Sequence, residues 1–465
     1  MKWPLLFFLG MVIALGVLTY NILKLNILPL KIFSLFLGLE IIICILSFFL
    51  LIRSKKAFII IGILLSIVSI FLNSTMNYYV HTTNHFMEKS FNSYVDIYTS
   101  YYVITNSQNS ISSMDEVDSS HLVYYHKYSR SIDLALKELG NYNYAETNSI
   151  GNTLTIMKDS MDTYLLISKA NYDYLLDSTI LFQEDQYKII KEFTVHYREE
   201  KNQDVKDSYT IYLNGVDFTG VMRDFNMLIT INTKSKKILL TPLLRGYYLD
   251  VPAYGIKDTL MCLGSLDSNV SKEALEQLFD ISIDYTVNVN TNSLVQVVDT
   301  LGGVEFCSDY PFTTTHTLTT DSYNDKGRKL EVTQGCREYN GVEILTIARE
   351  RLHLKNNERG RIDNCKKILL SIGKKTLSTT SLMNYKEVLD SYHNLYTTDM
   401  NKDVITNLAK SFIENYSNYE ILEQHVDGKD GTAIGHLGTV DVGVTFPDLE
   451  QVKTASNKIK EVLGN

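Results

Sequence analysis

The sequence has few positive charges for its length and lacks the short motifs of several large enzyme classes. Its 44 basic residues are outnumbered by 53 acidic ones, which gives a formal net charge of −9. An acidic chain has no overall attraction for nucleic acid. No Walker GxxxxGK[ST], HExxH or GxSxG pattern occurs, so these signatures indicate no catalytic site. Any anion-binding site must therefore be local, formed by arginines that the fold brings together.

Cysteine is also scarce, with five residues in the whole chain. Cys44 lies in an apolar run, and no CxxC or zinc-like spacing links Cys262, Cys307, Cys336 and Cys365, which argues against a cysteine-bound metal. An even number in an exported domain allows two disulfides. Because Cys307 and Cys336 flank one polar loop, we expect these two to pair.

The first 75 residues are almost entirely apolar and predict three transmembrane helices. The runs are Trp3–Leu23, Leu25–Ile52 and the shorter Phe58–Leu72. About 20 apolar residues are needed to cross the hydrocarbon layer. A cleaved signal peptide is a poor alternative, because no small-residue cleavage site follows and the apolar character continues too far.

Basic residues predict how these helices are oriented. Arg53, Lys55 and Lys56 lie between the second and third runs, and Lys2 lies at the N-terminus. Positively charged segments next to membrane helices stay in the cytoplasm. Three crossings then place the residues after about 76 outside the cell membrane.

The polar remainder predicts three regions. With 45% hydrophobic and 11% aromatic residues, the chain has enough apolar side chains for a large core. Strands such as Leu122–Tyr125 and Tyr164–Ser168 alternate with helical patterns, which indicates α/β structure. We expect a smaller α/β accessory domain over residues 76–205 that ends in a boundary loop, Arg198–Asp207, then a larger α/β domain over 206–425. A C-terminal extension over 426–465 should contain a strand near Thr439–Thr445 and a helix over Leu449–Leu463.

Candidate site residues are charged and confined to the larger domain. Arg349 and Arg351 would diverge by about 200° on a helix, but on an extended segment after a helix ending near Ala348 they face one site. Converging guanidinium groups suit a polyphosphate. Asp217 and Asp224 would suit a magnesium ion that bridges protein and phosphate. The alternatives are a turn or cap role for an aspartate, and a solvated surface or loop for the arginines.

The order of the segments around these residues resembles the LytR–CpsA–Psr family. No single segment is specific, but together they span about residues 209–376. Three N-terminal helices and an extra domain resemble the CpsA-type branch. The matching segments are Leu213–Asp217, Arg223–Asn232, Ile238–Thr241, Arg245–Leu249, Asp284–Asn290, Val298–Val304, Tyr339–Leu345, Ala348–Arg351 and Arg359–Asn364.

The resemblance implies a mixed sheet flanked by helices, a long apolar pocket for a polyprenyl chain, and a reaction in the cell wall. A glycopolymer such as capsule or teichoic acid, carried on undecaprenyl pyrophosphate, would be joined to peptidoglycan by a phosphodiester with Mg²⁺ assisting. Asp217 and Asp224 would bind the metal. The pyrophosphate would be held by Arg245, Arg349 and Arg351, with Arg223, Arg361 and Asn364 completing the phosphate side; Asp224, Arg245, Arg349 and Arg351 would be catalytic.

Two departures from the family pattern keep other functions open. Met222 stands where the family usually has an arginine, with Arg223 one place late, and Gly246 follows Arg245 where an aspartate is usual. A catalytically reduced scaffold that binds lipid-linked glycan near the export machinery is one alternative. A lipid pyrophosphatase, with water as the acceptor, is another. A transcriptional regulator is disfavoured by the acidic charge and by the expected location outside the cell.

Overall fold

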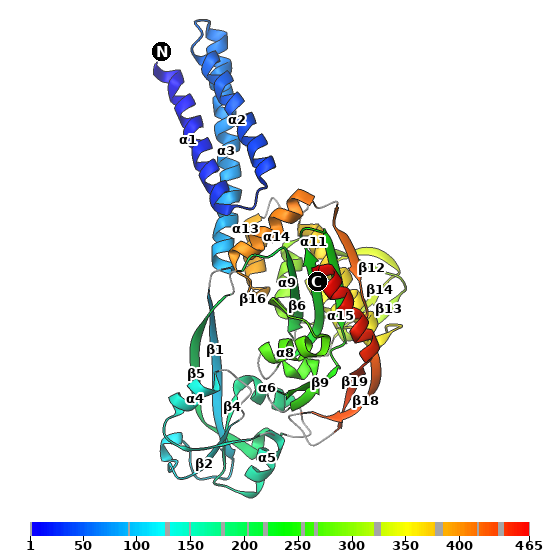
Figure 1. The fold of residues 1–465 in the computed structure, drawn as a ribbon. Helices are drawn as coiled ribbons and strands as arrows, with labels where there is room; N and C mark the ends of the chain where they lie inside the picture. The colour runs from blue at the N-terminus through cyan, green and yellow to red at the C-terminus, as the bar shows by residue number, and fades with distance from the viewer. Residues whose placement is uncertain are drawn as a thin grey trace.

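The computed structural model describes thirteen segments of the chain and shows a helical rod attached to two folded parts (Figure 1). The described residues are 2–91, 94–125, 131–147, 150–177, 182–201, 204–216, 222–252, 256–264, 268–319, 327–376, 385–415, 418–435 and 441–464.

Three N-terminal helices, α1 (Lys2–Leu25), α2 (Leu30–Leu51) and α3 (Lys56–Ser90), are long and apolar enough to cross a membrane, as the sequence predicts. The third apolar run is the shortest in sequence, yet α3 has 35 residues. At about 1.5 Å per residue it exceeds the roughly 30 Å of a hydrocarbon core. Its polar second half therefore continues the helix beyond the apolar run.

Inside the helical rod, α2 and α3 share a polar contact. Glu40 is 8% exposed and accepts hydrogen bonds from Ser69 Oγ (3.4 Å) and Asn73 Nδ2 (3.2 Å). A carboxyl group in an apolar span is costly unless it has such partners. These bonds favour one register between the two helices.

The extended end of α3 docks onto the larger folded part. Thr83 Oγ1 and the Tyr385 hydroxyl are 2.6 Å apart, and Ser90 Oγ lies 2.9 Å from His393 Nδ1. The ring of Phe91 stacks on that of Tyr396 with centroids 5.8 Å apart. The rod is thus fastened to the large domain through aromatic and polar contacts.

The accessory part is built on a five-stranded sheet in the order β3-β2-β4-β1-β5, with α4 packed on one face and α5 and α6 on the other. In Figure 1 the long β1–β5 ribbon leads from α3 to this sheet, at the opposite end from the rod. Its elements are β1 (Tyr94–Asn106), η1 (Met114–Glu116), β2 (Leu122–Tyr125), α4 (Ile132–Leu139), β3 (Asn143–Glu146), α5 (Ile150–Asp159), β4 (Tyr164–Ser168), α6 (Lys169–Asp177), η2 (Glu184–Gln186) and β5 (Tyr187–Glu200).

The expected boundary loop from Arg198 to Asp207 is wrong at its start, because β5 continues to Glu200, whereas Asp207 lies outside any strand as expected. Arg198 belongs to β5 and donates two hydrogen bonds to Asp96 on the paired strand β1. Thr233 N–H donates to the Asp207 carbonyl oxygen at 2.7 Å, directly before β6. Pairing with β1 therefore explains why the charged residues Arg198–Glu200 form a strand, although their composition predicts a loop.

The larger part contains a six-stranded mixed sheet in the order β16-β11-β6-β7-β8-β17. Strands β6 and β11 are parallel, as are β8 and β17, while the β6–β7–β8 meander is antiparallel. Helices α8 and α15 cover one face and α14 the other. The predicted α/β class with a mixed sheet flanked by helices is confirmed. The bounds are β6 (Ser208–Val216), β7 (Arg223–Asn232), β8 (Lys237–Leu243), α8 (Ser268–Phe279), β11 (Tyr285–Asn290), β16 (Tyr396–Thr398), α14 (Lys402–Asn415) and β17 (Glu420–Glu423).

A second core lies beside this sheet, where helices pack on two antiparallel strand pairs, β12 with β15 and β13 with β14. Its elements are α9 (Thr291–Thr300), β12 (Val304–Ser308), β13 (Phe312–Thr317), β14 (Lys329–Val332), β15 (Gly335–Tyr339), α10 (Gly341–Arg349), α11 (Asn357–Thr376) and α13 (Tyr385–His393). Cys307 on β12 and Cys336 on β15 face each other and form the expected disulfide. Cys262 and Cys365 are not joined by a disulfide, so the possible second bridge is not formed.

The C-terminal segment is integral to the larger part. Val452, Ala455 and Ile459 of α15 (Leu449–Leu463) are buried in the same core as the central sheet. The hairpin β18 (Gly428–Ile434) and β19 (Asp441–Pro447) reaches back to Tyr247, which bridges to Thr445. Short elements complete this region: β9 (Tyr248–Val251), β10 (Ile256–Thr259) and α7 (Leu260–Leu263).

Candidate functional site

A network of charged side chains joins three separate segments of the larger part. Asp224 lies at the start of β7 and Arg245 follows β8. Because β7 and β8 are antiparallel neighbours, the start of one adjoins the end of the other. The Arg245 guanidinium donates to the Asp224 carboxylate. Both side chains remain about a quarter to a third exposed, so this ion pair lies at an accessible edge of the sheet.

Helix α11 supplies the third segment, Glu358 and Arg361. Arg361 donates through Nε to Glu358 Oε2 at 3.1 Å, and its Nη2 donates to the main-chain oxygen of Asp224. Glu358 also faces Arg245, with Oε1 3.7 Å from Nε. We call the four residues Asp224, Arg245, Glu358 and Arg361 the charged cluster.

Arg361 is the most deeply buried member of the charged cluster. Burial by itself lowers the pKa of a guanidinium, but the charge of Glu358 and its hydrogen bond outweigh this effect and raise the pKa of Arg361. Arg361 therefore stays positively charged inside the protein. Glu358 was not among the predicted site residues, since one glutamate in a charged run carries no distinguishing signal.

Arg349 and Arg351 flank a buried carboxylate. Arg349 is the last residue of α10, and the backbone of Glu350 is extended, with ψ 136°. The expected extended segment after the helix is therefore present between the two arginines. The fully buried Glu350 accepts from the backbone N–H groups of Arg351 and His353 at 2.9 Å each. These bonds fix the path of the chain between the two arginines. Arg349 is half-buried and Arg351 exposed.

The last turn of α10 lies beside the charged cluster. Cys365 Sγ, one turn after Arg361 on α11, contacts the main-chain oxygen of Ala348 at 3.6 Å. Burial raises the pKa of the Cys365 thiol to about 11. This thiol is therefore protonated near neutral pH and acts in packing. The contact places the end of α10, and with it Arg349, against the helix that carries Arg361.

The other predicted residues are distributed around this edge. The Arg223 side chain is buried against Gly264, where an added Cβ would come within 2.4 Å of its Cγ. Asn364 lies on α11 with its side chain largely buried. Asp217 lies outside the described residues. Arg223 therefore does not share the accessible edge with Asp224, which matches the opposite facing of neighbouring strand residues.

Gly246, one of the two departures, has a structural explanation. Its carbonyl oxygen accepts from the Thr445 N–H at 2.7 Å, and an added Cβ would lie 3.2 Å from Thr445 Oγ1. A larger side chain would push against β19. The close approach of the C-terminal hairpin therefore favours glycine at this position.

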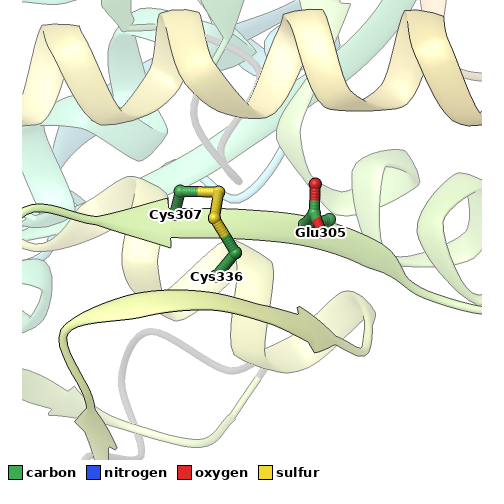
Figure 2. A group of neighbouring side chains, drawn as sticks. All are labelled: Glu305, Cys307 and Cys336. Atoms are coloured by element: carbon green, nitrogen blue, oxygen red, sulfur yellow. A yellow bond between two sulfur atoms is a disulfide. The ribbon is translucent and has the colours of Figure 1, made fainter.

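The metal-binding chemistry at the charged cluster is that of oxygen ligands. Asp224 offers a partly exposed carboxylate, the ligand type that Mg²⁺ prefers, beside arginines suited to phosphate. A separate group, Glu305 with Cys307 and Cys336, also brings ligand atoms together (Figure 2). Because the two sulfurs are bonded to each other, they are not thiolate ligands, and this group does not fit a metal.

The family model for LytR–CpsA–Psr proteins matches residues 178–458, well over half of the chain. The chain belongs to the LytR–CpsA–Psr family. The match includes α15 and the C-terminal hairpin, in agreement with their place in the large core.

Named relatives in the LytR–CpsA–Psr family are transferases. A polyisoprenyl-teichoic acid–peptidoglycan teichoic acid transferase TagU of Enterococcus faecalis is 25% identical over 46% of this chain and 69% of its own length. The TagU of Bacillus licheniformis is 26% identical over 50% and 72%. Among solved structures, Bacillus subtilis TagV is 19% identical, with a TM-score of 0.46 over 56% of this chain and 99% of its own.

Proposed function

We propose that this protein is a membrane-anchored phosphotransferase that moves a glycopolymer from a lipid pyrophosphate onto peptidoglycan. Family membership and the transferase names of its relatives support this function. The observation that carries it is the charged cluster, in which Arg245 donates to the carboxylate of Asp224 and Arg361, from a distant segment, donates to the main-chain oxygen of the same residue.

In the reaction we propose, a peptidoglycan hydroxyl oxygen attacks the glycan-bearing phosphorus of the lipid-linked substrate. The new phosphorus–oxygen bond forms as the bond to the bridging pyrophosphate oxygen breaks, and polyprenyl phosphate leaves with that electron pair. The hydroxyl proton is released to a base or to water. Arg245 and Arg349 would hold the phosphate oxygens, and the exposed Arg351 would reach the same substrate from the loop after α10. Positioning and charge neutralisation supply the acceleration.

Mg²⁺ fits this proposal as an assisting ion. Asp224 would be one ligand, and Asp217 the second one predicted from sequence. When bound, the ion would neutralise charge on the phosphate oxygens. Arg245 and Asp224 form an ion pair in the structure. Substrate phosphate binding to Arg245 and Mg²⁺ binding to Asp224 would therefore both act on the two members of this pair.

A membrane anchor supports the proposal of a lipid-linked substrate. Three helices fit a membrane-anchored protein, and α3 is fastened directly to the large domain. We propose that this domain lies outside the cell, as the basic residues between α2 and α3 predict. The glycopolymer would be a capsule or teichoic acid chain on undecaprenyl pyrophosphate, with the export machinery as a further partner.

The test uses the full chain in detergent with a synthetic lipid-pyrophosphate-linked sugar and peptidoglycan fragments, with and without Mg²⁺. Phosphodiester product that depends on Mg²⁺ and is lost at least 100-fold in Arg349→Ala is expected. Lys453→Ala, at an exposed position of α15, is the control and should keep full activity. Lipid binding without product would leave a scaffold. Release of polyprenyl phosphate without glycan transfer would indicate a pyrophosphatase.

A further inference from the structure

A pocket of about 450 Å³ opens beside α11, on a different side of that helix from the charged cluster. Its walls include Tyr310, Phe312, Lys355, Asn364, Lys367 and His425. This volume is within the range of small-molecule sites. Neither the family match nor the residues carried over from it, apart from Asn364, assign this pocket a role.

The charges on the pocket walls are balanced. Lys367 pairs with Asp309, and Lys366 with Glu423, each at 2.8 Å. Lys355 lies 4.4 Å from the centroid of the Tyr310 ring. Because the three lysines of the wall are matched in number by Asp309, Asp363 and Glu423, the pocket has no strong preference for an anion. Polar groups beside aromatic rings instead suit a ligand with hydroxyl groups and apolar C–H faces.

Asn364 adds an unused hydrogen-bonding group to this wall. It is 8% exposed, and its Nδ2 has no hydrogen-bond partner among the described residues. Most buried polar side chains in proteins have a partner, so such an exception calls for one. A hydroxyl or acetamide oxygen of a sugar is an acceptor of the right chemistry.

The pocket and the charged cluster share the first turns of α11. Gly360 and Asn364 line the pocket, while Arg361 between them points into the cluster. A helix with its side chains is about 10–12 Å across. The pocket therefore lies about one helix diameter from the proposed phosphate site, a separation that one or two sugar rings could span.

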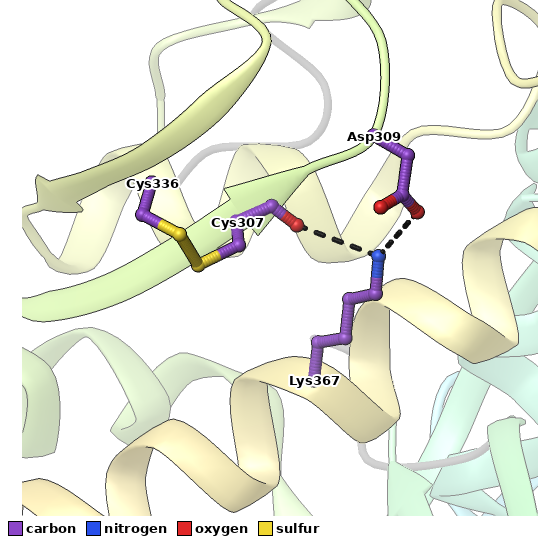
Figure 3. The surroundings of a disulfide bond; sticks show 4 residues. All are labelled: Cys307, Asp309, Cys336 and Lys367. Atoms are coloured by element: carbon purple, nitrogen blue, oxygen red, sulfur yellow. Dashed lines mark hydrogen bonds and ion pairs between the residues drawn. A yellow bond between two sulfur atoms is a disulfide. The ribbon is translucent and has the colours of Figure 1, made fainter.

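The disulfide supports one wall of the pocket (Figure 3). Cys307 is on β12, and the chain continues through Asp309 and Tyr310 along the wall. Lys367 of α11 donates to the Cys307 carbonyl oxygen at 3.4 Å and to Asp309 at 2.8 Å. These contacts hold the aromatic wall against the helix that carries Asn364.

We propose that this pocket is a saccharide-binding subsite that positions a sugar next to the phosphate being transferred. The proposal rests on the proposed function. The sugar belongs to the peptidoglycan acceptor or to the donor glycan, and both present the same recognition chemistry: hydroxyl groups, acetamide groups and apolar ring faces.

The test measures sugar binding directly, without turnover. The full chain in detergent is titrated calorimetrically with a peptidoglycan tetrasaccharide and, separately, with N-acetylglucosamine 1-phosphate. Tyr310→Ala and Asn364→Ala are compared with Tyr98→Ala, an exposed tyrosine on β1 far from the pocket. For one of the two probes, we expect binding to be at least tenfold weaker in both pocket variants and unchanged in Tyr98→Ala. If that probe is the peptidoglycan tetrasaccharide, the sugar belongs to the acceptor. If it is N-acetylglucosamine 1-phosphate, the sugar belongs to the donor.

The proposal is overturned if neither probe binds the wild type, or if binding is the same in both pocket variants as in Tyr98→Ala. Thermal unfolding and the non-reducing gel position of each variant show whether it folds. Arg349→Ala in the transfer assay reports on the proposed function alone. If the protein transfers glycan but its sugar binding is unaffected by Tyr310→Ala and Asn364→Ala, the subsite proposal is wrong and the proposed transferase function still stands.

Discussion

Glu358 and Arg361 form a buried ion pair one turn into α11, with Arg361 Nε 3.1 Å from Glu358 Oε2. The pair is tied to β7 through the main-chain oxygen of Asp224 and lies 3.7 Å from Arg245. Glu358 thus holds two of the arginines that we propose for the substrate pyrophosphate, and it presents them at fixed positions.

Removing Glu358 should destabilise the domain. Glu358→Ala leaves Arg361 buried without its counter-charge, which costs about 3–5 kcal/mol. Glu358→Gln also removes the counter-charge but keeps a hydrogen-bond acceptor for Arg361, so it should cost less than Glu358→Ala. Thermal unfolding of the detergent-solubilised chain measures both. Equal losses in the two variants would show that the lost counter-charge accounts for the whole effect and that the retained hydrogen-bond acceptor contributes nothing.

Glu350 should contribute a pH-dependent term to stability. Burial raises the pKa of this carboxyl, but bonds from His353, Thr315 and Arg351 outweigh it and hold the pKa below the usual 4.5. A lowered folded-state pKa gives stability that is present above pH 4.5 and lost as pH falls through the folded value. Glu350→Gln should cost about 1–3 kcal/mol at pH 7 and flatten this acid dependence.

The matched control for Glu350 is Glu338→Gln, an exposed carboxylate paired with Lys375. Its unfolding profile between pH 3 and pH 7 should follow the wild type. Since Glu350 orders the chain between Arg349 and Arg351, Glu350→Gln should also lower transfer activity at neutral pH. If Glu350→Gln lowers the stability but leaves transfer activity unchanged, activity does not depend on Glu350 ordering the chain between Arg349 and Arg351.

Gly341 is required by the close approach of α9 and α10. An added Cβ would lie 2.3 Å from the main-chain oxygen of Val295, closer than atoms can approach. Gly341→Ala should cost about 1–3 kcal/mol, as overpacking does. Gly373→Ala on α11, where nothing lies within 4 Å, should be neutral or stabilise by up to about 1 kcal/mol. Thermal unfolding compares the two alanines directly.

Loss of the disulfide should loosen the pocket wall. The Cys307→Ser, Cys336→Ser double variant opens a link across 29 residues and should cost about 2–4 kcal/mol. The wild type should migrate differently on non-reducing and reducing gels, and the double variant should not. A wild type with both thiols free to alkylation in the exported protein would contradict this pairing.

Topology can be tested by thiol labelling of whole cells. Ser54→Cys lies between α2 and α3, and Tyr98→Cys lies on β1. In a Cys44→Ser, Cys262→Ser, Cys365→Ser background, a membrane-impermeant maleimide should label Tyr98→Cys in intact cells and Ser54→Cys only after permeabilisation. The reverse pattern would place the large domain in the cytoplasm and exclude the proposed substrate.

Much of the molecule follows from local sequence pattern. The apolar runs predict the three helices, the period of Leu449–Leu463 gives α15, and Leu122–Tyr125 and Tyr164–Ser168 are the strands β2 and β4. The order of short segments identifies the family. Each of these signals lies within a window of residues that fold or align together, so neighbouring side chains are enough to reveal it.

Tertiary structure decided the rest. The sequence left a loop open as the alternative for the arginines, but α11 begins at Asn357 and carries Glu358 and Arg361 into the charged cluster. Contact with Thr445 explains Gly246, and docking on Tyr385 and Tyr396 accompanies the long α3. The roles of the site residues and of Mg²⁺ stay predictions. Which charges meet depends on contacts between segments that lie 21 to 137 residues apart in the chain, and no local periodicity records such contacts.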